Sequence, residues 1–84
     1  MTFREAIARS SYLMDQYYLA IITNNMDQVD IIYPKLQFSL DHIIDYDNTI
    51  KTPKDDLEFM ILFSKLVEKY EKISKLIKKI VNEQ

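Results

Sequence analysis

The side chains best suited to chemistry are a single histidine, His42, and the aspartates around it. His42 directly follows Asp41, and a histidine beside a carboxylate can serve general acid–base catalysis or phosphoryl transfer. Such a site also needs groups that bind an anion, and neither glycine nor arginine lies near His42. We therefore interpret His42 as a surface or boundary residue, and we assign no catalytic residue.

Carboxylates offer a second chemistry, the binding of a metal ion. Asp41 and Asp45 are four residues apart and share one face of a helix, and Asp27 and Asp30 precede them. A di-metal site in a helical bundle uses Glu-x-x-His motifs on two helices, and the sequence contains none. The absence of cysteine also excludes a Cys/His zinc site. We expect a solvated acidic face, without metal or cofactor.

The charge distribution argues against two further classes of function. Residues 1–50 hold three basic and seven acidic residues, a net charge of −4, whereas residues 51–84 hold eight and six, a net charge of +2. Tyr17, Tyr18 and Tyr33 lie in the acidic half, which lacks the basic groove that base stacking requires, so nucleic-acid binding is not expected. Helical chorismate mutases need several arginines in their pocket, and this chain has two near its N-terminus. We therefore do not expect an enzyme.

The composition predicts one all-helical domain, residues 1–84. The chain has no glycine and two prolines. Folds rich in β-turns or phosphate loops use glycine at those places, so its absence favours an all-α fold and excludes Gly-rich nucleotide motifs. The apolar runs are too short for a membrane span, and no signal-peptide core follows the N-terminal charges. We expect a cytoplasmic location.

Apolar periodicity and capping residues predict three helices in an antiparallel bundle. Thr2 and Glu5 form a capping box before an apolar stripe with steps of four and three residues, and this helix should end near residues 23–25. Asn25 is the expected N-cap of the second helix.

Two features are expected to shape the second helix. Pro34 lies in its interior, where proline removes one backbone hydrogen bond and clashes with the preceding turn. We therefore expect a kink near residues 31–33, or a break that divides the helix at Pro34. Residues 45–51 are expected to form a loop, because Asp47 and Asn48 are a turn signal.

The third helix is predicted to be the longest element. Thr52 is its N-cap and Pro53 its first residue, with acids early and lysines late to complement the helix dipole. About thirty residues reach about 45 Å, against about 30 Å for each other helix, so its end is expected to project. One side carries an apolar seam at steps of four and three residues: Phe59, Phe63, Leu66, Tyr70, Ile73, Ile77 and Ile80.

The segment between the first two helices follows the pattern of a known family. A polar turn is followed by the large residue Met26, an acid, and Val29 and Ile32 in Leu-x-x-Leu spacing. A proline-bearing loop and a long final helix complete the order of elements. In this layout the chain resembles the flagellar export chaperones of the FliT type. It departs from them in having Pro34 in the second helix, which also lacks the usual arginine.

The resemblance implies a chaperone that holds the C-terminal helical segment of the filament-cap protein before export and contacts the export ATPase apparatus. The physics is compatible, since an amphipathic helix can lay its apolar face in a groove between two helices, and a mobile terminal helix can cover that groove beforehand. We place the groove between the second and third helices. The candidate partner-binding residues are Leu36, Leu40, Ile43, Phe59, Phe63, Leu66, Tyr70, Ile73, Ile77 and Ile80.

The alternative is a self-associating structural bundle without a client. In this hypothesis the apolar seam of the third helix packs against a second copy of the chain, giving a homodimer. A stable dimer that leaves no free seam would favour this alternative over the chaperone. A small enzyme that uses His42 is the third hypothesis, and the sequence favours it least.

Overall fold

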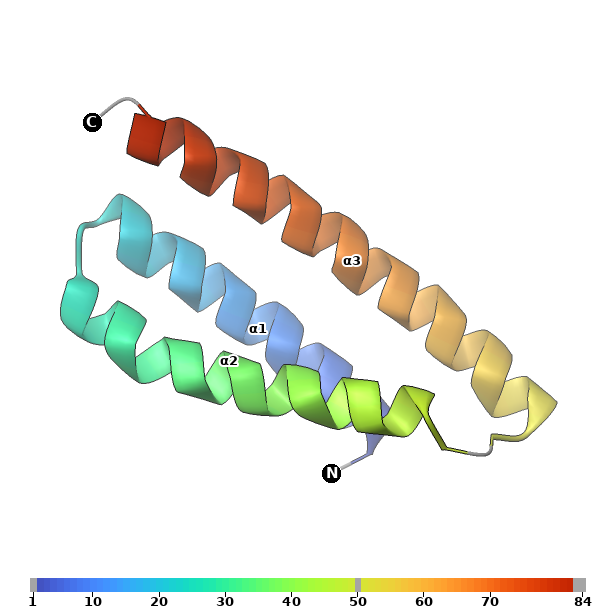
Figure 1. Ribbon diagram of the computed structural model, residues 1–84. Coiled ribbons are helices and arrows are strands. Elements are labelled where there is room, and N and C mark those ends of the chain that lie inside the picture. The colour runs from blue at the N-terminus through green and yellow to red at the C-terminus, as the bar shows by residue number, and fades with distance from the viewer. Residues whose placement is uncertain (1, 50, 83–84) are drawn as a thin grey trace.

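The computed structural model describes residues 2–49 and 51–82, which form three helices in chain order. They are α1 (Phe3–Ile22), α2 (Met26–Asp47) and α3 (Pro53–Asn82), arranged up, down and up (Figure 1). The central helix is α1, which packs against both others. Over the residues that the structure describes, no Cα atom of α2 lies within 8 Å of a Cα atom of α3. The predicted all-α bundle of three helices is confirmed.

Polar capping side chains begin each helix at the predicted place. Thr2, Asn25 and Thr52 each accept a hydrogen bond from the backbone N–H three residues later, at 3.2, 3.4 and 3.2 Å. α2 continues to Asp47, so the connecting segment is shorter than the predicted loop at residues 45–51. The last turn of α2 is held because the Tyr46 ring packs against core aromatic rings, a tertiary contact that local turn signals do not contain.

α2 runs through Pro34 as one continuous helix, so the expected break is wrong. Pro34 is exposed, and the residue whose carbonyl loses its partner, Asp30, is exposed as well. Water can therefore satisfy the freed carbonyl. Ile32 and Leu36, on either side of Pro34, are buried against α1 and hold both halves of α2 on the same neighbour.

The core lies along α1, because α1 packs along both of the other helices, whereas α2 touches α3 through the ring contact of Tyr46 with Phe59. Its apolar stripe meets the inward faces of α2 and α3 in one continuous cluster. The buried apolar residues are Phe3, Ala6, Ile7, Leu13, Met14, Ala20, Val29, Ile32, Leu36, Ile43, Phe59 and Leu66. α3 contributes the last two, both from its N-terminal half, so its C-terminal half is held more loosely.

An aromatic cluster closes the end of the core near the α2–α3 connection. Phe3, Tyr46 and Phe59 lie with ring centroids 4.6–5.7 Å apart. Lys51 covers the cluster, with its Nζ atom 4.2 Å from the Phe59 ring centroid. Two carboxylates, at 3.3 and 3.5 Å, bind this ammonium group from the solvent side. Lys51, which precedes α3, is therefore fixed to the core.

Charged side chains fix α3 to α1 along one edge. Arg4 donates two hydrogen bonds of 2.5 and 2.6 Å to Glu58, which lowers the pKa of that carboxyl below its usual value. Lys69 Nζ donates to Ser11 Oγ at 2.7 Å and to Asp15 Oδ2 at 2.8 Å. The residue numbers of the paired side chains rise together along α1 and α3, so α3 runs parallel to α1. It runs antiparallel to α2.

The C-terminal end of α3 lies beside the α1–α2 turn, so the expectation of a projecting end is wrong. Ile77 and Ile80 face Tyr17 and Ile21 of α1 across a shared hollow. Figure 1 shows the C-terminal end of α3 at the same level as the α1–α2 turn. It also shows the first turns of α3 extending past the last turn of α2. α3 is longer than the other helices, and its extra length lies at its N-terminal end, beyond the last turn of α2.

Two serines are fully buried where α1 meets α2. Ser10 and Ser39 have no exposed surface, and their hydroxyl groups have no hydrogen-bond partner among the described residues. The aromatic pairs Phe3–Tyr46 and Tyr17–Tyr33 set the register of the two helices, and the same register brings the serines to the same level. Their small size allows the helices to approach closely, at the cost of burying two unpaired hydroxyls.

We therefore expect Ser39→Ala to stabilise the protein. Removing an unpaired buried hydroxyl should raise the free energy of unfolding by about 1 kcal/mol. Ser64→Ala, at an exposed position of α3, controls for the higher helix propensity of alanine. Urea unfolding followed by circular dichroism measures both variants. If Ser39→Ala stabilises no more than Ser64→Ala, the buried hydroxyl has a partner after all.

Candidate interaction groove

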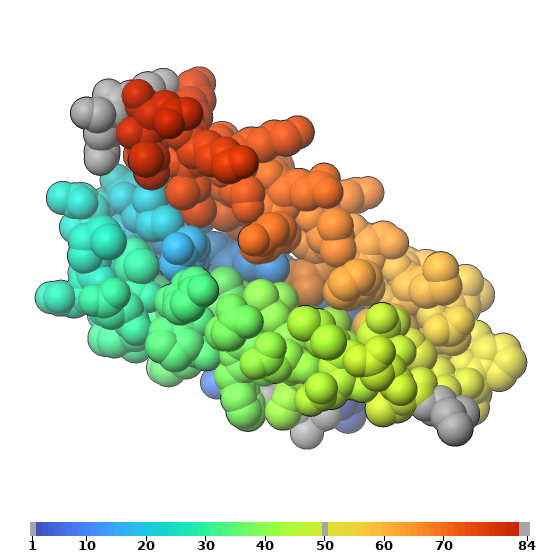
Figure 2. Space-filling view, in the orientation of Figure 1, coloured from blue at the N-terminus to red at the C-terminus, as the bar shows by residue number. Residues whose placement is uncertain are grey.

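The space between α2 and α3 is an apolar groove with α1 as its floor. Three adjoining hollows of about 320–350 Å³ each follow one another along it. Leu40 and Tyr70 line both the central hollow and the one nearer to the aromatic cluster. Tyr17 and Ile77 line both the central hollow and the one nearer to the α1–α2 turn, so the hollows are continuous. Figure 2 shows the side chains of α1, in blue, at the bottom of the groove between α2 in green and α3 in orange. We call this feature the α2–α3 groove.

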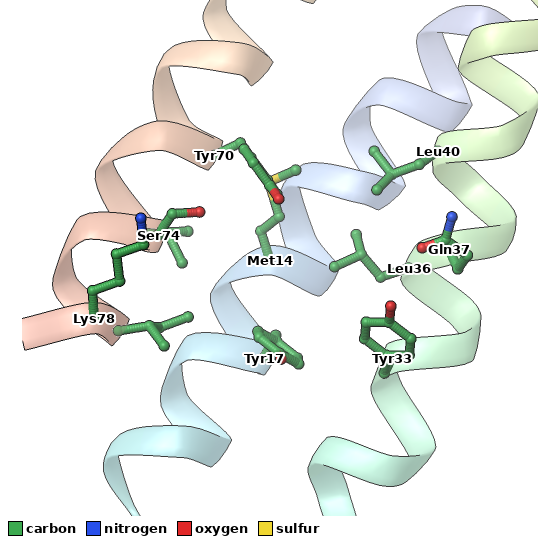
Figure 3. A pocket seen from close by; sticks show the side chains of 11 residues that line it. Met14, Tyr17, Tyr33, Leu36, Gln37, Leu40, Tyr70, Ser74 and Lys78 are labelled. Atoms are coloured by element: carbon green, nitrogen blue, oxygen red, sulfur yellow. The ribbon is translucent and has the colours of Figure 1, made fainter. Parts of the chain in front are cut away.

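The floor of the α2–α3 groove comes from α1. Met14 lies under the middle of the groove and is nearly completely buried, and Tyr17 continues the floor towards the α1–α2 turn. Figure 3 shows Met14 between Leu36 of α2 and Tyr70 of α3, and Tyr17 opposite Tyr33 of α2. The apolar stripe of α1 is wide enough to reach both neighbours, and Tyr17 stays partly exposed where the two neighbours separate.

The walls of the groove carry exposed apolar side chains. On α2, Tyr33 and Ile44 are 54% and 55% exposed. On α3, Phe63, Val67 and Tyr70 are 36%, 37% and 53% exposed. Single exposed apolar residues are ordinary, but these five stand along one continuous groove, and a contiguous apolar strip of this kind marks an interaction site.

The structure places the candidate partner-binding residues on both sides of the groove. All of them except Phe59 line it: Leu36, Leu40, Ile43, Phe63, Leu66, Tyr70, Ile73, Ile77 and Ile80. Leu36, Ile43 and Leu66 are also buried core residues, so they form the deep part of the groove. Phe59 is 2% exposed and lies in the aromatic cluster, with its ring stacked 5.5 Å from that of Phe63. It supports the wall without forming it.

Sequence reasoning missed the floor and parts of the upper walls. Met14 and Tyr17 lie on the apolar stripe of the first helix, and the width of that stripe was the signal that it serves two neighbours. Val67 lies seven residues after Met60 and seven before Ser74, on a second stripe beside the main seam of α3. Gln37 is polar and carries no periodic signal.

Charge around the groove is acidic on the α2 side. Asp30 and Asp41 lie seven residues before and four residues after Gln37, so they share its rim of the groove. Over its whole length α2 carries five aspartates and one lysine. The rim of α3 is mixed, with Glu71 four residues after Val67, and Lys78 lining the groove further along. A ligand in the groove meets negative charge mainly on its α2 flank.

The candidates for catalysis and metal binding stand apart from the groove. His42 is partly buried and packs on Phe38, with ring centroids 4.6 Å apart, and it does not line the three hollows. Within residues 2–49 and 51–82, no three histidine, aspartate or glutamate side chains are grouped so that they could hold a metal ion. His42 thus acts as a packing partner for Phe38.

Comparisons with known proteins assign no function to this chain. No protein-family model, no curated protein and no solved structure matches it. Among the helices that the structure describes, none has the length and apolar character needed to cross a lipid bilayer. Any function must therefore be inferred from the surface of the three helices, where the α2–α3 groove is the main apolar feature.

Proposed function

We propose that this protein is a chaperone or adaptor that holds an amphipathic α-helix of a client protein in the α2–α3 groove. The observation that carries the proposal is the separation of α2 from α3, which leaves apolar side chains of three helices facing one continuous groove. Binding of an amphipathic helix in a groove is a common mode of peptide recognition. The proposed activity is binding, and it requires no catalytic group.

The shape of the groove suits a helix. An α-helix with its side chains is about 10–12 Å across, and neighbouring helices pack with axes about 8–10 Å apart. A client helix above α1 would contact α2 on one flank and α3 on the other, completing a four-helix arrangement. Its apolar stripe would cover Met14 and Tyr17, and its flanks would meet Tyr33 and Tyr70.

The charge of the rim predicts the chemistry of the client helix. Asp30 and Asp41 lie on the α2 rim, so lysines or arginines on the adjacent flank of the client would be attracted there. A client helix with acidic residues on that flank would be repelled. We therefore propose a client helix with an apolar stripe bordered by basic residues.

The likeness in layout to export chaperones of the FliT type supports a flagellar client. On this proposal the client is the C-terminal helical segment of a filament-cap type protein, held in the cytoplasm before export. The export apparatus would be the second partner. Met26, Val29 and Ile32 carry the likeness, and they lie at the start of α2, where the groove reaches the α1–α2 turn.

Peptide titration tests the proposed binding activity. A labelled amphipathic peptide of about 18 residues, about 27 Å long as a helix, should bind saturably with a micromolar Kd and gain helicity. The same peptide with its apolar stripe changed to serine should not bind. Replacing its lysines with glutamate should weaken binding several-fold at low salt, and the difference should shrink as salt is added. Absence of binding by every stripe-bearing peptide would overturn the proposal.

A further inference from the structure

The two ends of the α2–α3 groove are different. At the end beside the α2–α3 connection, the rings of Tyr46 and Phe59 meet, with their centroids 5.1 Å apart. At the end beside the α1–α2 turn, α2 and α3 are separated by a hollow that Met26 and Ile77 line (Figure 1). We call these the connection end and the turn end. A helix bound in the groove has its N-terminus at one of them, and its two possible directions are not equivalent.

Side-chain charge changes sign between the two ends. Residues 2–9, 41–49 and 51–58 lie at the connection end and hold four basic and seven acidic residues, a net charge of −3. Residues 16–30 and 72–81 lie at the turn end and hold four basic and two acidic residues, a net charge of +2. The α3 rim of the groove follows the same trend, from Glu71 near its middle to Lys78 nearer the turn end.

The helix dipoles around the groove also favour one direction. α1, which forms the floor, and α3, which forms one wall, both begin at the connection end, whereas α2 begins at the turn end. The N-terminus of a helix carries partial positive charge and its C-terminus partial negative charge. A fourth helix that runs antiparallel to α1 and α3 therefore meets opposite dipole ends on two of its three neighbours.

We infer that the client helix lies antiparallel to α1 and α3, with an acidic N-terminal end beside Lys78 and a basic C-terminal end at the connection end. This inference rests on the proposed binding of a client helix, and it adds the direction and the charge order of that helix. Lys78 lines the central hollow, and Figure 3 shows its side chain running towards Ser74. In the part of the chain that the structure describes, no acidic side chain lies within 4.0 Å of Lys78 Nζ.

The two flanks of the client helix have different tasks. Its N-terminal acids belong on the α3 flank, because Asp30 of the α2 rim faces the other flank at the same end. Its C-terminal lysines would meet Asp41 and the negative charge of the connection end. Acids early and lysines late also suit the dipole of the client helix itself. In the reverse direction its lysines would lie beside Lys78 and its acids beside the aspartates.

Disulfide cross-linking measures the direction, because the chain contains no cysteine of its own. Met26 and Ile44 are 57% and 55% exposed and line opposite ends of the groove. They are eighteen residues apart on α2, about 27 Å, which matches a peptide of about 18 residues. Met26→Cys and Ile44→Cys are each mixed, in a glutathione buffer, with an amphipathic peptide that has glutamates in its first turn, lysines in its last turns and one terminal cysteine.

The peptide with an N-terminal cysteine should give at least about fivefold more disulfide with Met26→Cys than with Ile44→Cys. The peptide with a C-terminal cysteine should show the opposite preference. Lys78→Glu, added to Met26→Cys, should lower the disulfide yield of the N-terminal peptide at least about threefold at low salt. Lys65→Glu is the matched control. It lies on the same helix but lines the hollow between α1 and α3 on the other side, so the yield should not change.

Equal or reversed preferences would overturn the inference, and so would a Lys78→Glu variant that behaves as the Lys65→Glu control. Fluorescence titration of the same peptides separates this outcome from the fate of the groove. Saturable binding with equal or reversed preferences would contradict only the direction of the client helix. Absence of binding, or binding without a disulfide at either position, would overturn both the direction and the proposed function.

Discussion

Phe63→Asp is expected to abolish binding of an amphipathic helical peptide while the protein stays folded. Phe63 stands on the α3 wall of the groove and is 36% exposed, so water can still reach an aspartate there in the free protein. A bound client would bury that carboxylate against apolar side chains without a partner, which costs several kcal/mol. The peptide Kd should rise at least about 100-fold, equivalent to about 2.7 kcal/mol, as measured by fluorescence titration.

Ile61→Asp is the matched control for this experiment. It introduces the same charge two residues away, at an exposed apolar position on the opposite side of α3. Peptide binding should be unchanged in this variant. Leu66→Asp is a poor test, because Leu66 is 4% exposed and a buried charge would unfold the domain. A folded Phe63→Asp protein that still binds the peptide normally would show that the groove is not the binding site.

Phe59→Ala is expected to cause the largest loss of stability in this chain. Phe59 is 2% exposed and packs against Phe3, Tyr46 and Phe63, with Lys51 above its ring. Truncating a buried phenylalanine costs about 3–5 kcal/mol. Native domains are stable by about 5–15 kcal/mol in total, and a domain of this size is at the low end. Urea unfolding should therefore show a much lower midpoint, or a largely unfolded protein at 37 °C.

Phe38→Ala removes the same side chain from the surface and serves as the control. Phe38 is 55% exposed on α2 and packs on His42. Its truncation should change the free energy of unfolding by no more than about 0.5 kcal/mol. Equal losses for the two variants would mean that the aromatic cluster does not carry the stability of the core.

The starts of the helices could be predicted because their causes are local. Thr2, Asn25 and Thr52 act on backbone groups three residues away, and the sequence contains both sides of each interaction. Pro34 shows where local reasoning fails. An interior proline weakens a helix, and the sequence predicted a kink or a break on that ground, but burial of α2 on both sides of Pro34 outweighs this cost.

The packing partners of the helices could not be predicted in the same way. A seam on the third helix shows that it needs a neighbour, but not that this neighbour is the first helix in parallel orientation. That choice depends on contacts such as Arg4–Glu58 and Lys69–Asp15, more than fifty residues apart in sequence. For the same reason sequence reasoning found most of the groove walls, but it missed the floor and the wall residues Gln37 and Val67.

The contacts of α3 are unevenly distributed around its axis. One long edge is fixed to α1 by Arg4–Glu58 and by the Lys69 hydrogen bonds, and its start is anchored by Lys51. The other edge faces the groove. Among the described residues no Cα atom of α3 lies within 8 Å of a Cα atom of α2, and the two helices meet through the Tyr46–Phe59 ring contact near the start of α3. We therefore expect the C-terminal part of α3 to pivot about its fixed edge while every backbone hydrogen bond stays intact. We expect the width of the groove to adjust to client side chains of different size, so that selectivity comes from charge more than from shape.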